Sequence, residues 1–360
     1  MVAPATDTPS NLNLEVLDAV NPDEWDALVR QLNAGLFHSY FYAQTIYANN
    51  HGEPFYARFL NDQGNCVGLC LGNIQYSSLP VVRSIFKQAH LTALPAVSEP
   101  FHLTAAHAAL SRALSEREVM NLQVDSYDAP AQIGTPEDAA AKKIHRAEFR
   151  LDLTPALETL WANLAGTRRT QIRRVEREGL KCRQSWEWND VNCLAELTKK
   201  SSLRREQKTG ELFETPTSEK LRSLWEHLVQ RRLASVYLLE SDSEVLSANL
   251  IAIWNKRAYN LLAGSSPKGF KIGAASGLYW EIIKSLHQEG AVEFNLGGVA
   301  VDADQKDHPG RGLYDFKRDF GGALVSCNNL HYTLRASRYA IYQKLSAFRD
   351  RIGKKRPHKN

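Results

Sequence analysis

The sequence predicts an α+β protein of two domains, each built around a mixed sheet. The chain has 360 residues, whereas a common domain has about 150. A hydrophobic content of 43% and a charged content of 23% are ordinary for a globular protein. Strand-like segments often follow one another directly instead of alternating regularly with helices. This order is typical of mostly antiparallel mixed sheets that are flanked by helices.

The first domain is predicted over residues 14–145, including a linker, after a disordered tail at residues 1–13. A helix should begin at Pro22, because proline and the acidic residues after it favour the first helical turn. The run Asn-Asp-Gln-Gly at residues 61–64 predicts a hairpin turn. The other expected elements are strands at 14–20, 55–60, 66–75 and 120–124, helices at 37–48 and 103–114, and an alanine-rich linker at 128–143.

The second domain is predicted over residues 146–350, followed by a basic tail at residues 351–360. A helix at 168–178 should end at Gly179, because glycine is the usual residue after a helix. The remaining helices are expected at 155–164, 193–202, 218–230, 277–288 and 339–348, and the strands at 149–153, 235–240, 245–254, 258–264, 292–296 and 330–334.

Composition narrows the class of protein. A net charge of +4 and a pI of about 8.7 permit an anionic partner, although solubility alone explains so small an excess. The five cysteines are odd in number and form no CxxC pair, so reduced thiols are expected rather than a disulfide framework or a zinc ribbon. No apolar run approaches the roughly 20 residues of a membrane span, and residues 1–10 do not resemble a signal peptide. A cytoplasmic protein without a transmembrane segment is therefore expected.

One candidate anion site is the strand–loop–helix segment at residues 264–276. Small residues such as Gly273 let backbone N–H groups approach an anion, and a helix N-terminus favours negative charge. Ser266 and Lys268 lie in the same segment and could also contact a phosphate. The alternative is a tight turn whose small residues are there for steric reasons alone.

A second candidate site combines residues 294–298 with residues 312–322. A strand that ends in Gly297 and Gly298 brings its backbone close to another group. Phe316 and Phe320 are spaced i, i+4 and should anchor a short helix in the core. Lys317 would then point away from that face, where it could meet an oxyanion or a phosphate, or else remain a solvated lysine.

A third feature is the basic helix predicted at residues 168–178. Arg169, Arg173 and Arg177 repeat every fourth residue and share one face. A phosphate-rich partner could lie along this face with marked salt dependence, or the face could simply be solvated. Histidines at metal-ligand spacing and a Gly-x-Ser-x-Gly nucleophile motif are both lacking, so no metal site is expected.

Several of these segments resemble the Fem-type aminoacyl and peptidyl transferases of the GNAT superfamily. The resemblance is carried by residues 257–266, 294–298 and 312–321, and more weakly by residues near Trp25, Phe37 and Arg168. It extends from about residue 14 to residue 334. Phe270 departs from the acetyl-CoA pattern, which has a polar residue there, and the chain has no heptad insertion of the kind linked to tRNA in some Fem proteins.

The resemblance implies two tandem GNAT-like domains and transfer of an aminoacyl group from charged tRNA to an amine of a peptidoglycan precursor. In related enzymes the donor is acyl-CoA. The resemblance also implies that Lys317 stabilises the transition state and that Arg204 contacts the phosphates of the precursor. Asp315 is a candidate base, although the substrate's own phosphate could take the proton instead.

The sequence thus predicts an acyltransferase with no bound cofactor, which uses aminoacyl-tRNA or acyl-CoA as co-substrate. The expected partners are tRNA and a nucleotide-linked or lipid-linked sugar-peptide acceptor. The alternatives are an acyl-CoA-dependent N- or O-acetyltransferase and a non-catalytic module that binds nucleotide sugars or RNA. The predicted substrate-binding residues are Arg204, Ser266, Lys268, Gly273, Gly297, Gly298 and Tyr314, with Lys317 and Asp315 as catalytic residues.

Overall fold

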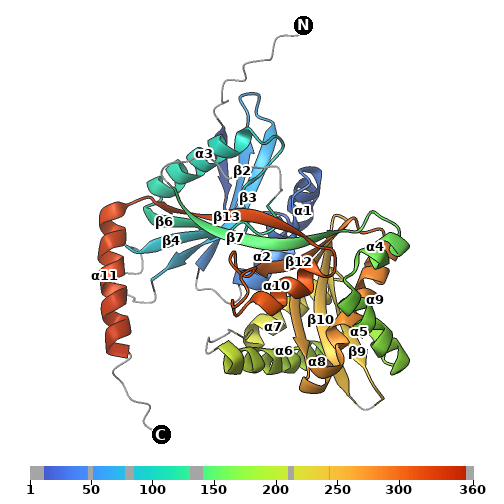
Figure 1. Cartoon of the computed structure of the whole chain (residues 1–360). Coiled ribbons are helices and arrows are strands. Elements are labelled where there is room, and N and C mark those ends of the chain that lie inside the picture. Colours follow the sequence, from blue (N-terminus) through green and yellow to red (C-terminus); the bar gives the residue numbers. More distant parts are fainter. Residues whose placement is uncertain are drawn as a thin grey trace. The chain divides into compact units, whose positions relative to one another are not determined.

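The computed structural model describes residues 12–47, 52–77, 85–129, 141–209, 215–242 and 244–353 (Figure 1). They fall into two compact units. The first lies within Met1–His38, Asn50–Ile144 and Asn328–Asn360, and the second within Ser39–Asn49 and His145–Cys327. Helices and strands mix in both units, and the predicted α+β class is confirmed.

The first unit contains a sheet in which all neighbouring strands but one pair are antiparallel. The strands lie in the order β1 (Asn13–Leu17), β2 (Gly52–Leu60), β3 (Cys66–Tyr76), β4 (Lys87–Leu91), β6 (Val119–Val124) and β13 (Ala323–Thr333), while the short β5 (Ala96–Val97) pairs with β3. Of β13, residues 328–333 belong to this unit. The exception is the pair β4–β6, which is parallel and is connected by α3 (His102–Glu116).

Helices α1 (Pro22–Gln31) and α3 bury apolar side chains of the first unit. The side chain of Asn21 accepts hydrogen bonds from the first backbone N–H groups of α1, so this helix starts at Pro22 as predicted. Trp25 of α1 packs against Tyr56 with ring centroids 5.2 Å apart. Leu103, Leu110 and Leu114 of α3 are buried.

The second unit repeats this strand pattern. Its strands lie in the order β8 (Lys181–Ser185), β9 (Ala234–Glu240), β10 (Val245–Trp254), β11 (Arg257–Ser265), β12 (Glu293–Val299) and β7 (Ala141–Asp152). Of β7, residues 145–152 belong to this unit. Again one pair is parallel, β11–β12, and helices connect it, here α8 (Pro267–Ile272) and α9 (Ala274–Gln288). The shared order of an antiparallel meander, a helix-linked parallel pair and a final antiparallel strand confirms the predicted tandem fold.

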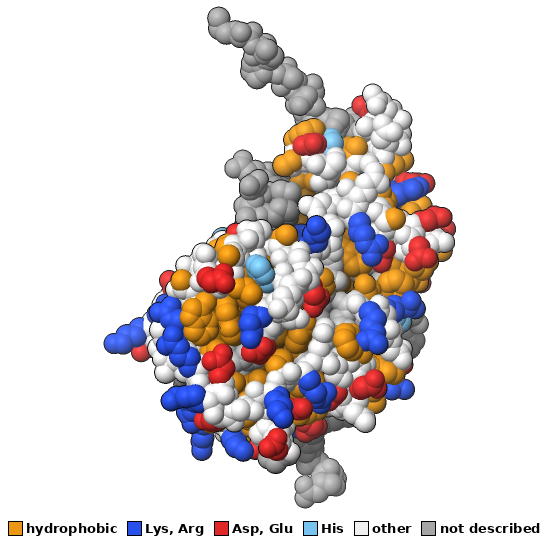
Figure 2. All heavy atoms as spheres, turned by 90° about the vertical axis from the view of Figure 1, so that its right-hand side faces the viewer, with side chains coloured by type: hydrophobic (Ala, Val, Ile, Leu, Met, Phe, Trp, Pro, Cys, Tyr) orange, Lys and Arg blue, Asp and Glu red, His pale blue; other side chains and the backbone are white. Residues whose placement is uncertain are grey.

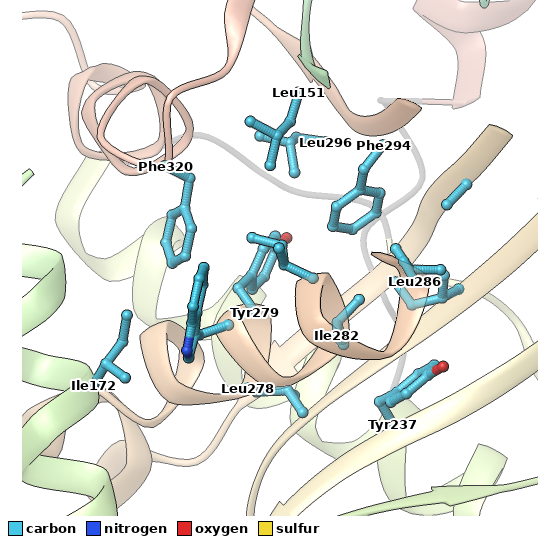
Figure 3. Close-up of a cluster of buried hydrophobic side chains, with 14 of the residues drawn as sticks. Leu151, Ile172, Tyr237, Leu278, Tyr279, Ile282, Leu286, Phe294, Leu296 and Phe320 are labelled. Atoms are coloured by element: carbon cyan, nitrogen blue, oxygen red, sulfur yellow. The ribbon is translucent and has the colours of Figure 1, made fainter. Parts of the chain in front are cut away.

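The core of the second unit is built around α9. Leu278, Ile282 and Ile283 of this helix are fully buried. Tyr279 lies between Phe294 and Phe320 (Figure 3), with ring centroids 6.2 and 5.4 Å away. Helices α4 (Leu157–Asn163), α5 (Gly166–Arg177) and α10 (Arg311–Arg318) surround this cluster, and α5 lies alongside α9. The core therefore fixes the position of α10, which carries Lys317.

Three further helices complete the second unit. α6 (Trp188–Thr209) packs on β10 and β11, and α7 (Ser218–Leu224) continues into a π-helical turn, η3 (Trp225–Val229). α2 (Tyr40–Tyr47), although near the start of the chain, packs against α7 and η3. The guanidinium of Arg231 lies 4.1 Å from the ring centroid of Phe41.

The structure differs from the sequence prediction in several elements. The strands β4 and β8 were not predicted, because Lys87-Gln88 and Lys181-Cys182-Arg183-Gln184 are too polar to indicate strands. β7 begins at Ala141, so residues 141–143 are strand rather than linker. The predicted bounds 14–145 and 146–350 treat each domain as continuous, whereas the first unit takes α11 (Ala336–Gly353) from the end of the chain. The rest of the predicted linker from 130 to 140, the first residues of the N-terminal tail and the tail from 354 to 360 lie outside the described residues.

Candidate active site

The parallel pair of the second unit opens into a gap between its two strands. β11 and β12 are paired only from Arg257–Glu293 to Tyr259–Asn295, although β11 continues to Ser265 and β12 to Val299. In the first unit the matching pair, β4–β6, stays paired to the ends of both strands. An opening between parallel strands therefore occurs in the second unit and not at the corresponding pair of the first.

Helix α6 supplies hydrogen-bond partners for backbone groups at the edge of β11 that faces this opening. The hydroxyl of Ser201 accepts a hydrogen bond from the Ser265 N–H at 2.9 Å and donates one to the Ser265 carbonyl at 3.2 Å. Thr198 donates to the carbonyl of Ala263 at 3.4 Å. Buried backbone groups need such partners when a strand loses its neighbour. α6 thereby keeps the opening intact and brings its next residues, Arg204 and Arg205, to this part of the unit.

On the other strand, Gly297 shapes the backbone at the opening. Its φ of +87° lies in the left-handed region that favours glycine, and the pairing of β12 with β7 is irregular between Asn295 and Gly297. The Asn295 side chain accepts a hydrogen bond from the Gly297 N–H at 2.8 Å and so holds this bulge in place.

Lys317 reaches this bulge from α10. Its Nζ donates a hydrogen bond to the carbonyl of Gly298 at 2.8 Å, and only 4% of the residue is exposed. A Cβ atom at Gly297 would lie 3.4 Å from Nζ, so the glycine leaves room for the ammonium group. Phe316 and Phe320 pack on each other and on Tyr279, as the i, i+4 spacing predicts. The alternative of a solvated lysine is therefore wrong.

Burial changes the protonation of Lys317. It lowers the pKa of the amine to about 7, against a usual value of 10.5, because a charged group is disfavoured away from water. The positive charges of Arg146 and Arg205 lower the pKa as well, while the carboxylate of Glu148 raises it. The lysine therefore titrates near neutral pH, where both of its protonation states are accessible.

Uncharged polar groups extend from the opening into the unit. The Asn249 amide donates to the Asn260 side chain at 3.1 Å, and the Asn260 amide donates to the Tyr279 hydroxyl at 2.7 Å. The carbonyl of Asn260 would lie 3.8 Å from a Cβ atom at Gly297. Burial raises the pKa of Tyr279 to about 12, so this hydroxyl stays protonated at neutral pH.

Asp315, the predicted base, is ion-paired. Its carboxylate lies 2.8 Å from Arg311 and 2.9 Å from Arg318. The hydrogen bond from Arg311 is the main cause that lowers the pKa of Asp315, and a lowered pKa weakens a carboxylate as a proton acceptor. Tyr314 packs against Phe149 with ring centroids 5.1 Å apart. The role of Asp315 as base and that of Tyr314 in substrate binding stay predictions.

The predicted anion-binding residues at 264–276 have local partners. Ser266 caps α8 by accepting a hydrogen bond from the Gly269 N–H at 3.0 Å. Lys268 forms an exposed ion pair with Glu244 at 2.7 Å. Gly273, with a φ of +81°, ends α8, and a Cβ atom there would lie 2.9 Å from the side chain of Gln171. Each residue thus has a structural role, and its role toward a phosphate stays a prediction.

The basic face of α5 divides into two parts. Arg169 donates to the carbonyls of Ala162 and Leu164 at 2.8 and 2.7 Å and so holds the end of α4. Arg173 and Arg177 instead line an open hollow of about 600 Å³ together with Thr170 and Glu176. Figure 2 shows basic side chains gathered toward the lower left of one face, with acidic ones among them.

The guanidinium of Arg204 lies over an exposed aromatic ring. Its guanidinium carbon is 4.2 Å from the ring centroid of Phe270, and 61% of Phe270 is exposed. Nη1 of Arg204 is buried without a hydrogen-bond partner among the described residues. Burial, followed by the charge of Arg205, lowers the pKa of Arg204. The two arginines form a pair of like charges, which favours an anionic ligand.

The sequence prediction missed a set of charged residues on β7. Arg146, Glu148 and Arg150 are largely buried and joined by ion pairs. The predicted strand covered only residues 149–153, so Arg146 and Glu148 lay outside it, whereas β7 begins at Ala141. The local sequence does not indicate that these charged residues are buried.

Comparison with known proteins agrees with this geometry. Residues 166–318 match the sequence family described as an acetyltransferase (GNAT) domain, a range that includes both strands of the opening and Lys317. No curated protein matches the chain by sequence. Among the described residues, no helix has the length and hydrophobicity to cross a bilayer, and no group of three His, Cys, Asp or Glu side chains could hold a metal ion.

Solved structures share the fold over almost the whole chain. FemX has a TM-score of 0.71 and 14% identity, with 91% of this chain and 99% of FemX covered. L-PGS from Bacillus licheniformis has a TM-score of 0.53 and 15% identity, with coverages of 91% and 97%. A conserved protein of unknown function from Bacteroides thetaiotaomicron has a TM-score of 0.56 and 11% identity, with coverages of 89% and 99%.

The matched domain at residues 166–318 supports an acyltransferase, and the fold of the whole chain is similar to that of FemX. The resemblance to the Fem-type transferases that the sequence indicated is confirmed in the fold, which is that of FemX.

Proposed function

We propose that the protein transfers an aminoacyl or acyl group to an amine of a cell-envelope precursor, and that transfer takes place at the opening between β11 and β12. The observation that carries the proposal is Lys317, a buried lysine whose Nζ lies 2.8 Å from the Gly298 carbonyl at this opening. Lysine is seldom buried, so this position favours a chemical role.

The reaction joins the acceptor amine to the carbonyl carbon of the donor. The C–N bond forms as the amine attacks, and the carbonyl oxygen becomes an oxyanion. Protonated Lys317 is suited to donate a hydrogen bond to that oxyanion, because donors in a dry site stabilise developing charge strongly. As the oxyanion collapses, the C–O or C–S bond of the donor breaks, and the leaving oxygen or sulfur takes up a proton to depart as a hydroxyl or thiol. The proton of the amine goes to a phosphate of the substrate or to Asp315, and the lowered pKa of Asp315 favours the phosphate.

The donor in this proposal is aminoacyl-tRNA, with acyl-CoA as the alternative. The fold shared with FemX supports the first, and the GNAT acetyltransferase domain supports the second. Both donors carry phosphates, which Arg204 and the hollow beside Arg173 and Arg177 could contact. The acceptor is proposed to be a nucleotide-linked or lipid-linked sugar-peptide. A cytoplasmic location is part of the proposal, because charged tRNA and acyl-CoA are both available there.

Binding and turnover of the two donors, measured side by side at two salt concentrations, test the proposal. We expect charged tRNA to bind with strong salt dependence, because counterions are released from neutralised phosphates, and acyl-CoA to have no effect. Uncharged tRNA and free CoA serve as controls for the acyl group. Saturable acyl-CoA binding and turnover without a response to tRNA would replace the aminoacyl proposal by the alternative.

Replacement of Arg204 by glutamine tests the contact with the precursor's phosphates. We expect KM for a phosphate-bearing acceptor to rise about tenfold with kcat nearly unchanged, because a charge-assisted hydrogen bond contributes roughly 1.5–3 kcal/mol. The control is Lys268→Gln, which removes a charge from an exposed ion pair and should leave KM as it is. Equal KM values in both variants would exclude the phosphate contact of Arg204.

A further inference from the structure

The charged residues of β7 form a buried cluster next to the proposed site. Glu148 is 1% exposed and accepts hydrogen bonds from Arg146 and from Nε of Arg150, both at 2.9 Å. On the opposite face of the strand, Phe149 and Leu151 enter the hydrophobic core. Burial of charges has a desolvation cost that the ion pairs often do not recover. The cluster therefore calls for an explanation other than stability.

The strand register connects this cluster to Lys317. Glu148 is paired with Gly298 across β7 and β12, and the Gly298 carbonyl accepts the hydrogen bond from Lys317. A Cβ atom at Gly298 would lie 3.5 Å from Nη2 of Arg146. The Gly298 residue thus pairs with Glu148 of the cluster and also accepts the hydrogen bond from the lysine.

The charges around Lys317 give Glu148 a distinct position. The charged groups that act on the lysine are Glu148 and Arg146 of β7 and Arg205 of α6. Glu148 is the acidic member of this set, and its effect on the pKa of Lys317 is opposite to that of the two arginines. On α10 itself, Asp315 is paired with Arg311 and Arg318. Among the described residues, the buried carboxylate of Glu148 therefore balances the positive charge that acts on Lys317.

We propose that Glu148 is a positioning residue for the transfer reaction. Held by Arg146 and Arg150, its carboxylate fixes the Gly298 end of β12 and keeps the ammonium form of Lys317 in place at the opening. This inference rests on the proposed function, because it assigns Glu148 a role through Lys317. It also gives Gly298 a role, because this residue pairs with Glu148 and its carbonyl accepts the hydrogen bond from Lys317.

The test is the pH dependence of turnover in Glu148→Gln. In the parent, kcat should fall at high pH as Lys317 loses its proton, and this fall is the alkaline limb of the pH profile. We expect the limb to move to lower pH by about one unit in Glu148→Gln, because loss of a nearby opposite charge shifts the pKa of the lysine by that amount or more. kcat at pH 5.5 or below and KM should change little. The control is Asp190→Asn, which breaks an ion pair with Arg183 elsewhere in the unit and should leave the limb unmoved. An unmoved limb in Glu148→Gln overturns the proposal, and restoration of the limb by Glu148→Asp supports it.

A second variant keeps the test available if the single one fails to fold. Removal of one partner from a buried charge cluster is strongly destabilising, because it leaves the other charges uncompensated. The double variant Glu148→Gln/Arg150→Gln removes one negative and one positive charge together, so the net charge of the cluster is unchanged. Arg150 is not among the charges that act on Lys317, which are Glu148, Arg146 and Arg205. The same shift of the limb is expected in this variant.

Direct titration of the lysine separates this proposal from the proposed function. NMR of protein with ¹³C-labelled lysine, assigned by comparison with Lys317→Met, follows protonation of Lys317 without any substrate. A lower midpoint in Glu148→Gln than in the parent is the expected result. If this midpoint shifts while no donor is turned over, the proposed function fails and the link between Glu148 and Lys317 stands. If the midpoint is unchanged, the link fails whatever the enzyme does.

Discussion

Replacement of Lys317 by methionine is expected to lower kcat by about 100- to 1000-fold, the usual effect of removing one oxyanion donor. Methionine has nearly the length of lysine and no charge, so the opening between β11 and β12 keeps its shape. KM should change little, because the ammonium group is proposed to act in the transition state. Steady-state kinetics with the donor identified in the binding test measure the effect.

The same variant should be more stable than the parent at neutral pH. Burial of Lys317 lowers its pKa to about 7, so the folded state must either hold a buried charge or release a proton. The gain from removing this amine exceeds the loss of its hydrogen bond to Gly298, and we expect a net rise in the free energy of unfolding of roughly 1–2 kcal/mol. Lys284→Met, which removes a surface lysine paired with Glu281, is the control for both measurements. Unchanged kcat in Lys317→Met would remove the lysine from the mechanism.

The sign of the pH effects follows from the lowered pKa of Lys317. The protonated form is the proposed donor, so activity should fall as pH rises through about 7. Between about 7 and 10.5 the unfolded chain binds a proton that the folded protein does not, and the stability of the parent should rise with pH across this window. Lys317→Met should lack this contribution to the rise.

The second large effect is expected from Gly264→Ala. A Cβ atom at Gly264 would lie 2.3 Å from the backbone nitrogen of Thr198, so the extra methyl group would push α6 away from β11. The hydrogen bonds between Ser201 and Ser265 would be strained at the same time. We expect the free energy of unfolding to fall by about 3 kcal/mol, as in other cases of overpacking.

Gly166→Ala is the matched control for this substitution. Gly166 starts α5, and a Cβ atom there would meet no atom within 4 Å. Alanine at such a position should stabilise the protein by about 0.5 kcal/mol, because it restricts the unfolded chain. Urea denaturation of both variants measures the difference. Equal stabilities would mean that α6 does not pack on β11 at Gly264.

Hydrophobic patterns in the sequence predicted the apolar elements of the fold well. The meander of β9, β10 and β11, the helix α9 and the helix α3 are strongly apolar on at least one face, and all were expected near their observed bounds. The strands β4 and β8 escaped prediction because their residues are mostly polar and they are recognisable only beside their neighbours. The N-terminal half of β7 was missed for the same reason, whereas that of β13 was missed although it contains Leu324, Val325 and Cys327.

The site was predicted in part. Gly297 and Gly298 with Lys317 were identified from local spacing, and the structure brings all three together. The groups that surround Lys317, such as Glu148 and Arg146, lie about 170 residues away in the chain, and only tertiary pairing of β7 with β12 makes them neighbours. Conversely, the sequence suggested that Ser266 and Lys268 were available to bind a phosphate. In the structure Ser266 caps α8 and Lys268 pairs with Glu244, and a local sequence pattern does not reveal these contacts.

The closed pair β4–β6 has a consequence for counting reaction centres. The fold is duplicated, but the strands that part in the second unit stay paired in the first. Under the proposed function one polypeptide then holds one centre, and the concentration of active centres equals the concentration of chains. Under the same proposal the first unit has no transfer step to support, so its surfaces can serve recognition without having to preserve a place for the reacting groups.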